Sequence, residues 1–167
     1  MYQKNMYEIL PMNTKIAFEI SKWIYDGPYL LYSFQNTEET INELMNYEYY
    51  FANRNPGNEL FGFFCFGEAA LVPTYEKEAY NEIALDIGLG MKPEFCGRGL
   101  GFGFLCAGLE FAKMNKLEGR SKIRLTVADF NKRAIRLYEK AGFKYVRSLK
   151  HDETGIKFNV MILDLED

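Results

Sequence analysis

The residues with the clearest potential for chemistry lie in a glycine-rich stretch at positions 85–104, LDIGLGMKPEFCGRGLGFGF, which holds six of the 14 glycines of this 167-residue chain. Glycine weakens a strand or a helix by about 0.5–1 kcal/mol relative to alanine, so this accumulation needs a reason. The pattern predicts a strand that stops before Pro93 and a helix that begins near Gly99. Glycines at a helix start let backbone N–H groups approach a phosphate, which the partial positive charge of the helix N-terminus also attracts. We therefore expect residues 97–101 to bind a phosphate group.

Two widespread phosphate-binding motifs do not fit this loop. The dinucleotide fingerprint G-x-G-x-x-G requires a third glycine where Phe102 stands. The P-loop ends in G-K-[ST], and the sequence has no such ending here. Spacing therefore excludes both motifs.

The loop resembles motif A of the GCN5-related N-acetyltransferases, the GNAT superfamily, which reads Q/R-x-x-G-x-G/A after a strand and a proline-containing turn. Here the frame is CGRGLG at residues 96–101, with Pro93 upstream. A second block, LTVADFNKRAIRLYEKAGFKYV at residues 125–146, matches the family's strand followed by N-x-x-A-I-x-L-Y-E-K-x-G-F. Cys96 stands where the family has Gln or Arg, and Arg98 is a substitute source of positive charge. For Cys96 itself, a reactive thiol and an ordinary loop residue are the alternatives.

The resemblance implies a fold of the α/β class, of the mixed α+β kind, as one domain over residues 1–167. The expected core is a mixed, twisted sheet of about seven strands, two of them parallel and splayed, with about four flanking helices. The patterns agree with strands at 6–10, 83–91, 122–128, 144–149 and 157–165, a hairpin at 47–67, and helices at 14–23, 37–46, 99–115 and 131–140. Asn36 and Asn131 are the expected N-caps of the second and fourth helices, and Gly142 follows the end of the fourth.

Acetyl-CoA is the cosubstrate that the resemblance implies, lying between the two splayed strands. Its pantetheine arm would pair with the first of these strands as an added strand would, which explains Gly88 and Gly90; a bulge is the alternative. Asn131 would lie near pantetheine, a role compatible with helix capping. The residues expected to bind acetyl-CoA are Leu89, Gly90, Met91, Cys96, Gly97, Arg98, Gly99, Leu100, Gly101, Asn131 and Tyr138.

Tyr138 is the residue that the resemblance places near the thioester sulfur. A phenol with a pKa of about 10 can protonate a departing thiolate of similar basicity. The helical pattern alone favours a core role, because Ala134, Ile135 and Tyr138 share one helix face.

A general base is useful because the attacking amine must be neutral, whereas a lysine-like amine has a pKa of about 10.4. Asp86 is the expected base, with Glu82 or a group near Thr126 as alternatives, and a solvated or salt-bridged Asp86 remains open. The backbone N–H of Leu89 is the expected donor to the oxyanion.

The acceptor pocket is expected in the aromatic-rich segment at residues 23–34. Trp23, Tyr25 and Tyr29 would line it, and Asp26 would anchor a cationic amine. The alternative is that these aromatic side chains close the edge of the core. The acceptor would be a small-molecule or peptide amine.

Composition limits the other partners. The net charge of −3 argues against nucleic acid, and no apolar run is long enough to span a membrane. The three cysteines, Cys65, Cys96 and Cys106, suit neither a disulfide framework nor a zinc site, so we expect no metal and a reducing, cytoplasmic location. The N-terminus does not resemble a signal peptide, and a homodimer is left open.

The sequence therefore predicts an N-acetyltransferase that moves an acetyl group from acetyl-CoA to a primary amine by direct attack in a ternary complex. Two alternatives remain: a CoA-binding sensor or regulatory module of the same fold with little turnover, and an acyltransferase for a longer acyl group.

Overall fold

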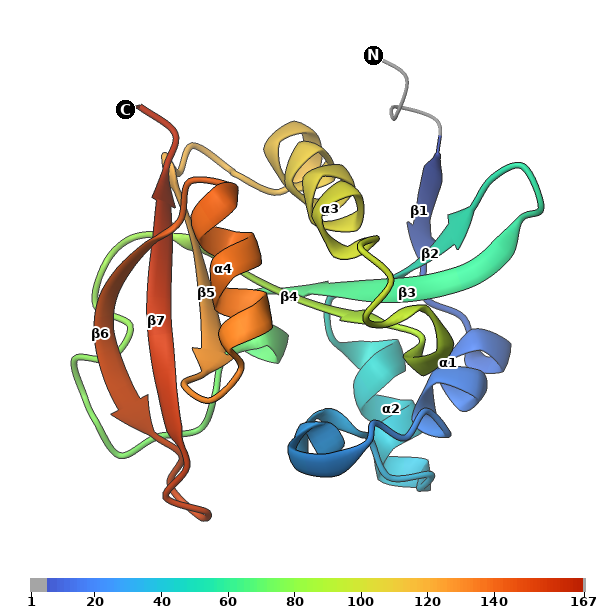
Figure 1. The fold of residues 1–167 in the computed structure, drawn as a ribbon, viewed down its shortest axis with the longest axis horizontal. Helices are drawn as coiled ribbons and strands as arrows, with labels where there is room; N and C mark the ends of the chain where they lie inside the picture. The colour runs from blue at the N-terminus through green and yellow to red at the C-terminus, as the bar shows by residue number, and fades with distance from the viewer. Residues whose placement is uncertain (1–5, 167) are drawn as a thin grey trace. The chain divides into compact units, whose positions relative to one another are not determined.

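A computed structural model describes residues 6–166, whose strands form a mixed sheet in the hydrogen-bonded order β1-β2-β3-β4-β5-β7-β6 (Figure 1). The prediction of a mixed sheet with flanking helices is confirmed. The bounds are β1 Tyr7–Pro11, α1 Thr14–Ser21, η1 Gly27–Tyr32, α2 Glu38–Asn46, β2 Tyr49–Arg54, β3 Glu59–Phe66, η2 Gly67–Ala70, β4 Leu85–Met91, η3 Pro93–Phe95, α3 Gly101–Asn115, β5 Lys122–Ala128, α4 Lys132–Lys140, β6 Lys144–Lys150 and β7 Lys157–Asp164, where η marks a 3-10 helix.

The chain divides into two compact units. Unit 1 holds the described residues up to Cys65 together with residues 89–109, and unit 2 holds residues 66–88 and 110–166. Strand β4 and helix α3 each belong in part to both units. A single domain over the whole chain stays a prediction. Among residues 6–166, none of the helices is both long and apolar enough to cross a membrane.

Unit 1 is built on an antiparallel meander of β1, β2 and β3. The register runs from Tyr7↔Arg54 in the first pair to Tyr49↔Cys65 in the second, with an irregularity at Ala52/Asn53. Residues 61–66 of β3 are all buried, so both faces of this strand are covered, and the first half of α3 packs on one of them. The ring centroids of Phe64 and Phe104 lie 4.4 Å apart in a stacked arrangement, and both side chains are fully buried, so this contact joins β3 to α3 in the core.

Glycine is needed in unit 1 where aromatic rings press against the backbone. A Cβ at Gly108 on α3 would overlap the ring of Phe64 on β3, and a Cβ at Gly62 on β3 would overlap the ring of Phe104 on α3. Gly108 is therefore a point of close helix–sheet packing.

Unit 2 combines parallel and antiparallel pairing. β4 begins beside β5 in parallel, with Leu85↔Ile123 and Asp86↔Arg124 in register, and β7 pairs antiparallel with both β5 and β6. In Figure 1, α4 covers one face of these last strands. Apolar side chains such as Ile123, Leu125 and Val160 are buried in this core.

The helix caps test the local predictions. Asn131 caps α4, accepting a hydrogen bond from the Ala134 N–H at 3.2 Å, and Gly142 follows the helix with a φ of 103°. For α2 the predicted cap is wrong: Thr37 accepts from the Thr40 N–H, whereas the Asn36 side chain accepts from the Ser21 hydroxyl at 3.0 Å. Asn36 thus ties the start of α2 to α1.

Gly108→Val should destabilise the protein by about 1–3 kcal/mol, because the new side chain would overlap the buried ring of Phe64. Urea unfolding followed by circular dichroism measures the change. Gly57→Ala is the matched control, since a Cβ at Gly57 meets no atom within 4 Å. Equal stability of Gly108→Val and the native chain would contradict the packing described here.

Candidate functional site: a glycine loop and a buried polar network

The glycine-rich loop of unit 1 is anchored at its start by Phe61 on β3. The Lys92 N–H donates to the Phe61 carbonyl at 2.8 Å, which holds the exit of β4. The chain then makes the short helix η3, whose last residue, Phe95, is buried and stacks on the Phe61 ring at a centroid distance of 4.9 Å. The Arg54 guanidinium lies over both rings. The residues that enter the loop are therefore fixed before any ligand binds.

The loop itself exposes backbone. Gly97 and Gly99 have φ angles of 75° and 73°, in the left-handed region that other residues rarely adopt, and both are exposed. A Cβ at Gly99 would meet no atom within 4 Å, so there is room at this point for a bound group. Arg98 is exposed between the two glycines, and α3 begins two residues after Gly99. These features suit a phosphate group, which needs backbone donors and positive charge, and the pyrophosphate of acetyl-CoA stays the predicted ligand.

Cys96 turns back toward the end of β4. Its Sγ atom lies 3.8 Å from the carbonyl oxygen of Met91 and 3.7 Å from that of Lys92. The thiol is a weak hydrogen-bond donor to these two oxygens. The thiol is half-buried in this position. The side chain at the family's Gln or Arg position thus contacts the strand that precedes the loop.

The second half of β4 carries the residues expected beside pantetheine, Leu89, Gly90 and Met91. A Cβ at Gly90 would overlap the ring of Phe63 on β3. Gly90 therefore has a packing reason within unit 1, and its contact with pantetheine stays a prediction.

The aromatic segment of unit 1 divides in role. Trp23 is 8% exposed, and its ring centroid lies 6.3 Å from that of Phe63. Trp23 therefore packs in the core, which is the alternative to lining the acceptor pocket. The Tyr25 hydroxyl donates to the Met91 carbonyl at 2.7 Å, so it is engaged within the protein. Burial is the main cause that raises the pKa of Tyr25 above its usual value, with a smaller effect from Cys96. Asp26 is exposed and Tyr29 half-buried, at the start of η1.

In unit 2, Asp86 forms a buried ion pair with Arg124. Both carboxylate oxygens accept from the guanidinium, Oδ1 from Nε at 2.7 Å and Oδ2 from Nη2 at 2.8 Å. The Arg124 side chain is only 4% exposed, and the two residues are register partners on the parallel strands β4 and β5. This is the salt-bridged arrangement that the sequence left open for Asp86. The role of general base stays a prediction.

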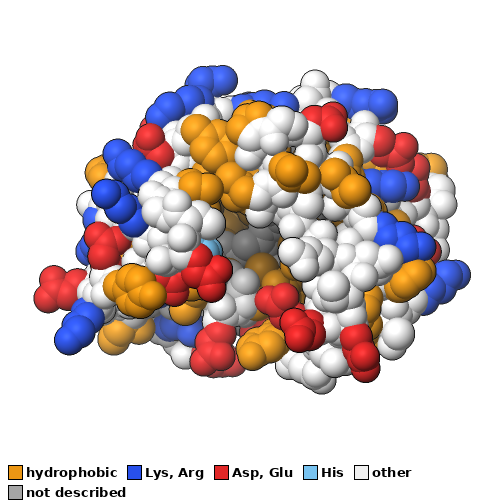
Figure 2. Space-filling view, turned by 90° about the horizontal axis from the view of Figure 1, so that it is seen from below, with side chains coloured by type: hydrophobic (Ala, Val, Ile, Leu, Met, Phe, Trp, Pro, Cys, Tyr) orange, Lys and Arg blue, Asp and Glu red, His pale blue; other side chains and the backbone are white. Residues whose placement is uncertain are grey.

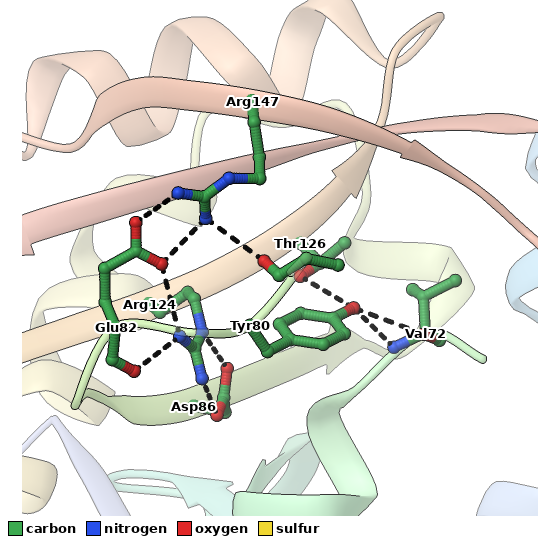
Figure 3. A network of polar contacts seen from close by, with 8 residues as sticks. Val72, Tyr80, Glu82, Asp86, Arg124, Thr126 and Arg147 are labelled. Atoms are coloured by element: carbon green, nitrogen blue, oxygen red, sulfur yellow. Dashed lines mark hydrogen bonds and ion pairs between the residues drawn. The ribbon is translucent and has the colours of Figure 1, made fainter. Parts of the chain in front are cut away.

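Glu82 and Arg147 extend this pair into a network (Figure 3). Arg124 also donates to the Glu82 carbonyl at 2.9 Å, while Arg147 binds both carboxylate oxygens of Glu82 and donates to the Ala79 carbonyl at 3.1 Å. Hydrogen bonding from Arg147 is the main cause that lowers the pKa of Glu82. A lowered pKa makes Glu82 a weaker base than an ordinary glutamate.

Tyr80 closes the other end of the network. Its hydroxyl accepts from the Val72 N–H at 2.9 Å and from the Thr126 hydroxyl at 3.4 Å, and the Arg124 guanidinium lies 5.0 Å from its ring (Figure 3). Burial raises the pKa of Tyr80. The segment between β3 and β4, which has little regular structure, is thereby fixed to β5.

Tyr138 lies half-buried on α4, in the last turn of the helix. Its ring centroid is 6.1 Å from that of Phe143, and its carbonyl accepts from the Phe143 N–H at 3.0 Å. Asn131 begins the same helix as its N-cap. The catalytic role of Tyr138 and the ligand contact of Asn131 stay predictions.

The predicted site residues fall into two sets. Unit 1 brings together the glycine loop, the end of β4 and the aromatic segment, whereas Asp86, Asn131 and Tyr138 belong to unit 2. Three members of the polar network were not predicted from the sequence: Arg124, Arg147 and Tyr80. Arg124 did leave a signal, because it is a charged residue between two apolar ones on a strand that is otherwise buried. Among residues 6–166, no group of three or more His, Cys, Asp or Glu side chains is placed to hold a metal ion.

Asp86→Asn should lower the free energy of unfolding by about 3–5 kcal/mol, because it leaves the buried Arg124 charge without its partner. Denaturant unfolding measures the loss. Asp164→Asn is the matched control: it breaks a 2.8 Å pair with Lys122 that is partly exposed, and it should change stability far less. A role as general base only would produce the opposite pattern, normal stability with a lower kcat.

Comparison with known proteins identifies the family. The sequence profile of the "Acetyltransferase (GNAT) family" matches residues 15–143. No curated protein matches the chain in sequence. Among solved structures, a GNAT-family acetyltransferase from Bacillus anthracis superposes with a TM-score of 0.72 at 18% identity, over 97% of this chain and 96% of the other.

Two further structures come from Vibrio cholerae. A chimera of its spermidine N-acetyltransferase SpeG with hSSAT has a TM-score of 0.67 at 19% identity, covering 96% of each chain. The spermidine/spermine N-acetyltransferase SpeG with manganese ions has a TM-score of 0.68 at 16% identity, over 98% of this chain and 95% of the other. At these identities the superpositions establish the shared fold, and the profile match over most of the chain establishes the family. The chain belongs to the GNAT acetyltransferase family.

Proposed function

We propose that this protein transfers the acetyl group of acetyl-CoA to a primary amine by direct attack of the amine on the thioester in a ternary complex. The observation that carries the proposal is the exposed, left-handed glycine backbone at Gly97 and Gly99, immediately before α3 and in the frame of the family's cofactor motif. Acetyl-CoA supplies the activated acyl group and a thiolate leaving group. The protein's task is to bind, to orient and to move protons.

Binding of the cosubstrate is assigned to unit 1. The N–H groups of residues 97–101 and the first turn of α3 would hold the pyrophosphate, with Arg98 adding positive charge. Leu89 and Met91 would pair with the pantetheine arm, and the Leu89 N–H would donate to the oxyanion. The fixed entry to the loop supports this proposal, because a loop that is ordered in advance loses less entropy on binding.

Proton transfer is assigned to α4. Tyr138 would donate its phenolic proton to the departing thiolate, a transfer between groups of similar pKa. Neither carboxylate predicted as a base is free, because Asp86 is bound at both oxygens by Arg124 and Glu82 by Arg147. We therefore propose that water takes the proton from the amine, and that these two carboxylates hold β4, β5 and the segment between residues 72 and 82.

The acceptor we propose is a cationic amine. Residues 19–48 contain six carboxylates and one lysine, namely Glu19, Asp26, Glu38, Glu39, Glu43 and Glu48 against Lys22. Acidic side chains also appear on the face seen in Figure 2. Such an excess attracts cations over a distance of about one Debye length. Two of the similar structures are of the spermidine N-acetyltransferase SpeG, which supports a polyamine as the first acceptor to try.

The decisive experiment combines binding with turnover. Acetyl-CoA at 100 times its Kd should stabilise the protein by about 2.7 kcal/mol, which thermal unfolding detects. A panel of polyamines, amino acids, aminoglycosides and peptides, with detection of free thiol, should then identify an amine that releases CoA. Binding without thiol release by any amine would favour the sensor alternative, and absence of binding would contradict the proposal.

Tyr138→Phe should lower kcat by about 10²–10⁴-fold while leaving the Kd of acetyl-CoA nearly unchanged, because only the proton donor is removed. Steady-state kinetics and calorimetric binding separate the two effects. Tyr75→Phe is the matched control, since Tyr75 is 82% exposed. Native turnover in Tyr138→Phe would remove the residue from the mechanism.

A further inference from the structure

The carbonyl of Met91, the last residue of β4, accepts a hydrogen bond from far along the chain. The Tyr25 hydroxyl donates to it at 2.7 Å, and the Cys96 thiol lies 3.8 Å away as a weaker second donor. Tyr25 precedes Met91 by 66 residues, so this contact is tertiary and not part of a turn. Both members belong to unit 1.

The direction of this carbonyl follows from peptide geometry. The Met91 C=O and the Lys92 N–H belong to one peptide group, and in a trans peptide they point in opposite directions. The Lys92 N–H donates to the Phe61 carbonyl on β3. The Met91 carbonyl therefore points away from β3, to the opposite edge of β4.

The Tyr25 side chain is held firmly in place. Its backbone N–H donates to the Ser33 hydroxyl at 2.9 Å, which closes the segment containing η1. The phenol is half-buried and its pKa is raised mainly by burial, so the hydroxyl stays protonated and remains a donor at neutral pH. The segment predicted to contact the acceptor amine is thus tied directly to β4.

We propose that the Tyr25 hydroxyl occupies the last acceptor on the edge of β4 along which pantetheine pairs, and so fixes the register of that arm. An arm that pairs like an added strand needs free N–H and C=O groups in sequence. A carbonyl oxygen has two lone pairs, and here Tyr25 and the weaker donor Cys96 are both directed at the Met91 carbonyl. The arm is therefore confined to the positions before Met91, which places the thioester at one point along the strand. Tyr25 is then a positioning residue, and this inference rests on the proposed function.

Tyr25→Phe tests the proposal because it removes the hydroxyl and keeps the ring. Without the hydroxyl, the end of β4 loses its link to residue 25 and must be ordered by the ligand, at about the cost of one hydrogen bond, so the Kd of acetyl-CoA should rise by about two- to tenfold. The Kd of 3′-phospho-ADP, which has the nucleotide and both bridging phosphates but lacks pantetheine, should not change. Calorimetry measures both dissociation constants. Steady-state kinetics should also give a lower kcat for the variant, because its thioester is displaced.

Two further variants complete the test. Tyr75→Phe, at an exposed position of unit 2, should leave both constants unchanged. Ser33→Ala, which frees the Tyr25 backbone, should weaken acetyl-CoA binding in the same selective way and decides the matter if Tyr25→Phe does not fold.

The outcomes separate the two proposals. If the native protein binds neither ligand, the proposed function fails. If the native protein binds acetyl-CoA but the variants bind it equally well, the role of Tyr25 is contradicted. Equal weakening of both ligands would also contradict it, because a general loss of structure is not specific to pantetheine.

Discussion

Unit 2 depends on the burial of one positive charge. The guanidinium of Arg124 is almost completely removed from water, and the cost of that removal is several kcal/mol unless partners replace the lost hydration. Asp86, the Glu82 carbonyl and the face of Tyr80 supply the replacement. Each partner comes from the chain before β5, so satisfying Arg124 also determines where β4 begins and how the preceding segment runs.

In unit 1, the position of the glycine loop depends on a single residue. One residue, Phe61, holds the loop in two ways, through its carbonyl to Lys92 and through its ring to Phe95. The exposed glycines that follow need no contacts of their own, because the chain enters them from a fixed direction. The flexible glycines therefore follow residues that are held in place, which suits a loop that must present backbone N–H groups.

Features that depend on residues close along the chain could be predicted from the sequence. Strand β5 and the N-cap of α4 follow from alternation and from an asparagine three residues before Ala134, so their bounds were found closely. The two blocks around the glycine loop and Tyr138 pointed to the family, which the profile match confirms.

What the sequence could not supply are contacts set by the tertiary fold. The engagement of Tyr25 by Met91, the ring that lies on Gly90 and the partner of Asp86 all join residues far apart in the chain. The wrong cap of α2 has a related cause, because Asn36 is drawn to Ser21 on another helix. Local propensity cannot anticipate such competition.

Two glycines of unit 1 lie directly against phenylalanine rings: Gly90 against Phe63, and Gly108 against Phe64. Each pair occupies one shared volume, with all of the side chain on one partner. Evolution can redistribute that volume only by changing both positions together, for example a smaller residue in place of the ring with alanine in place of the glycine. These pairs should therefore covary among relatives, and each glycine acts as half of a two-residue unit.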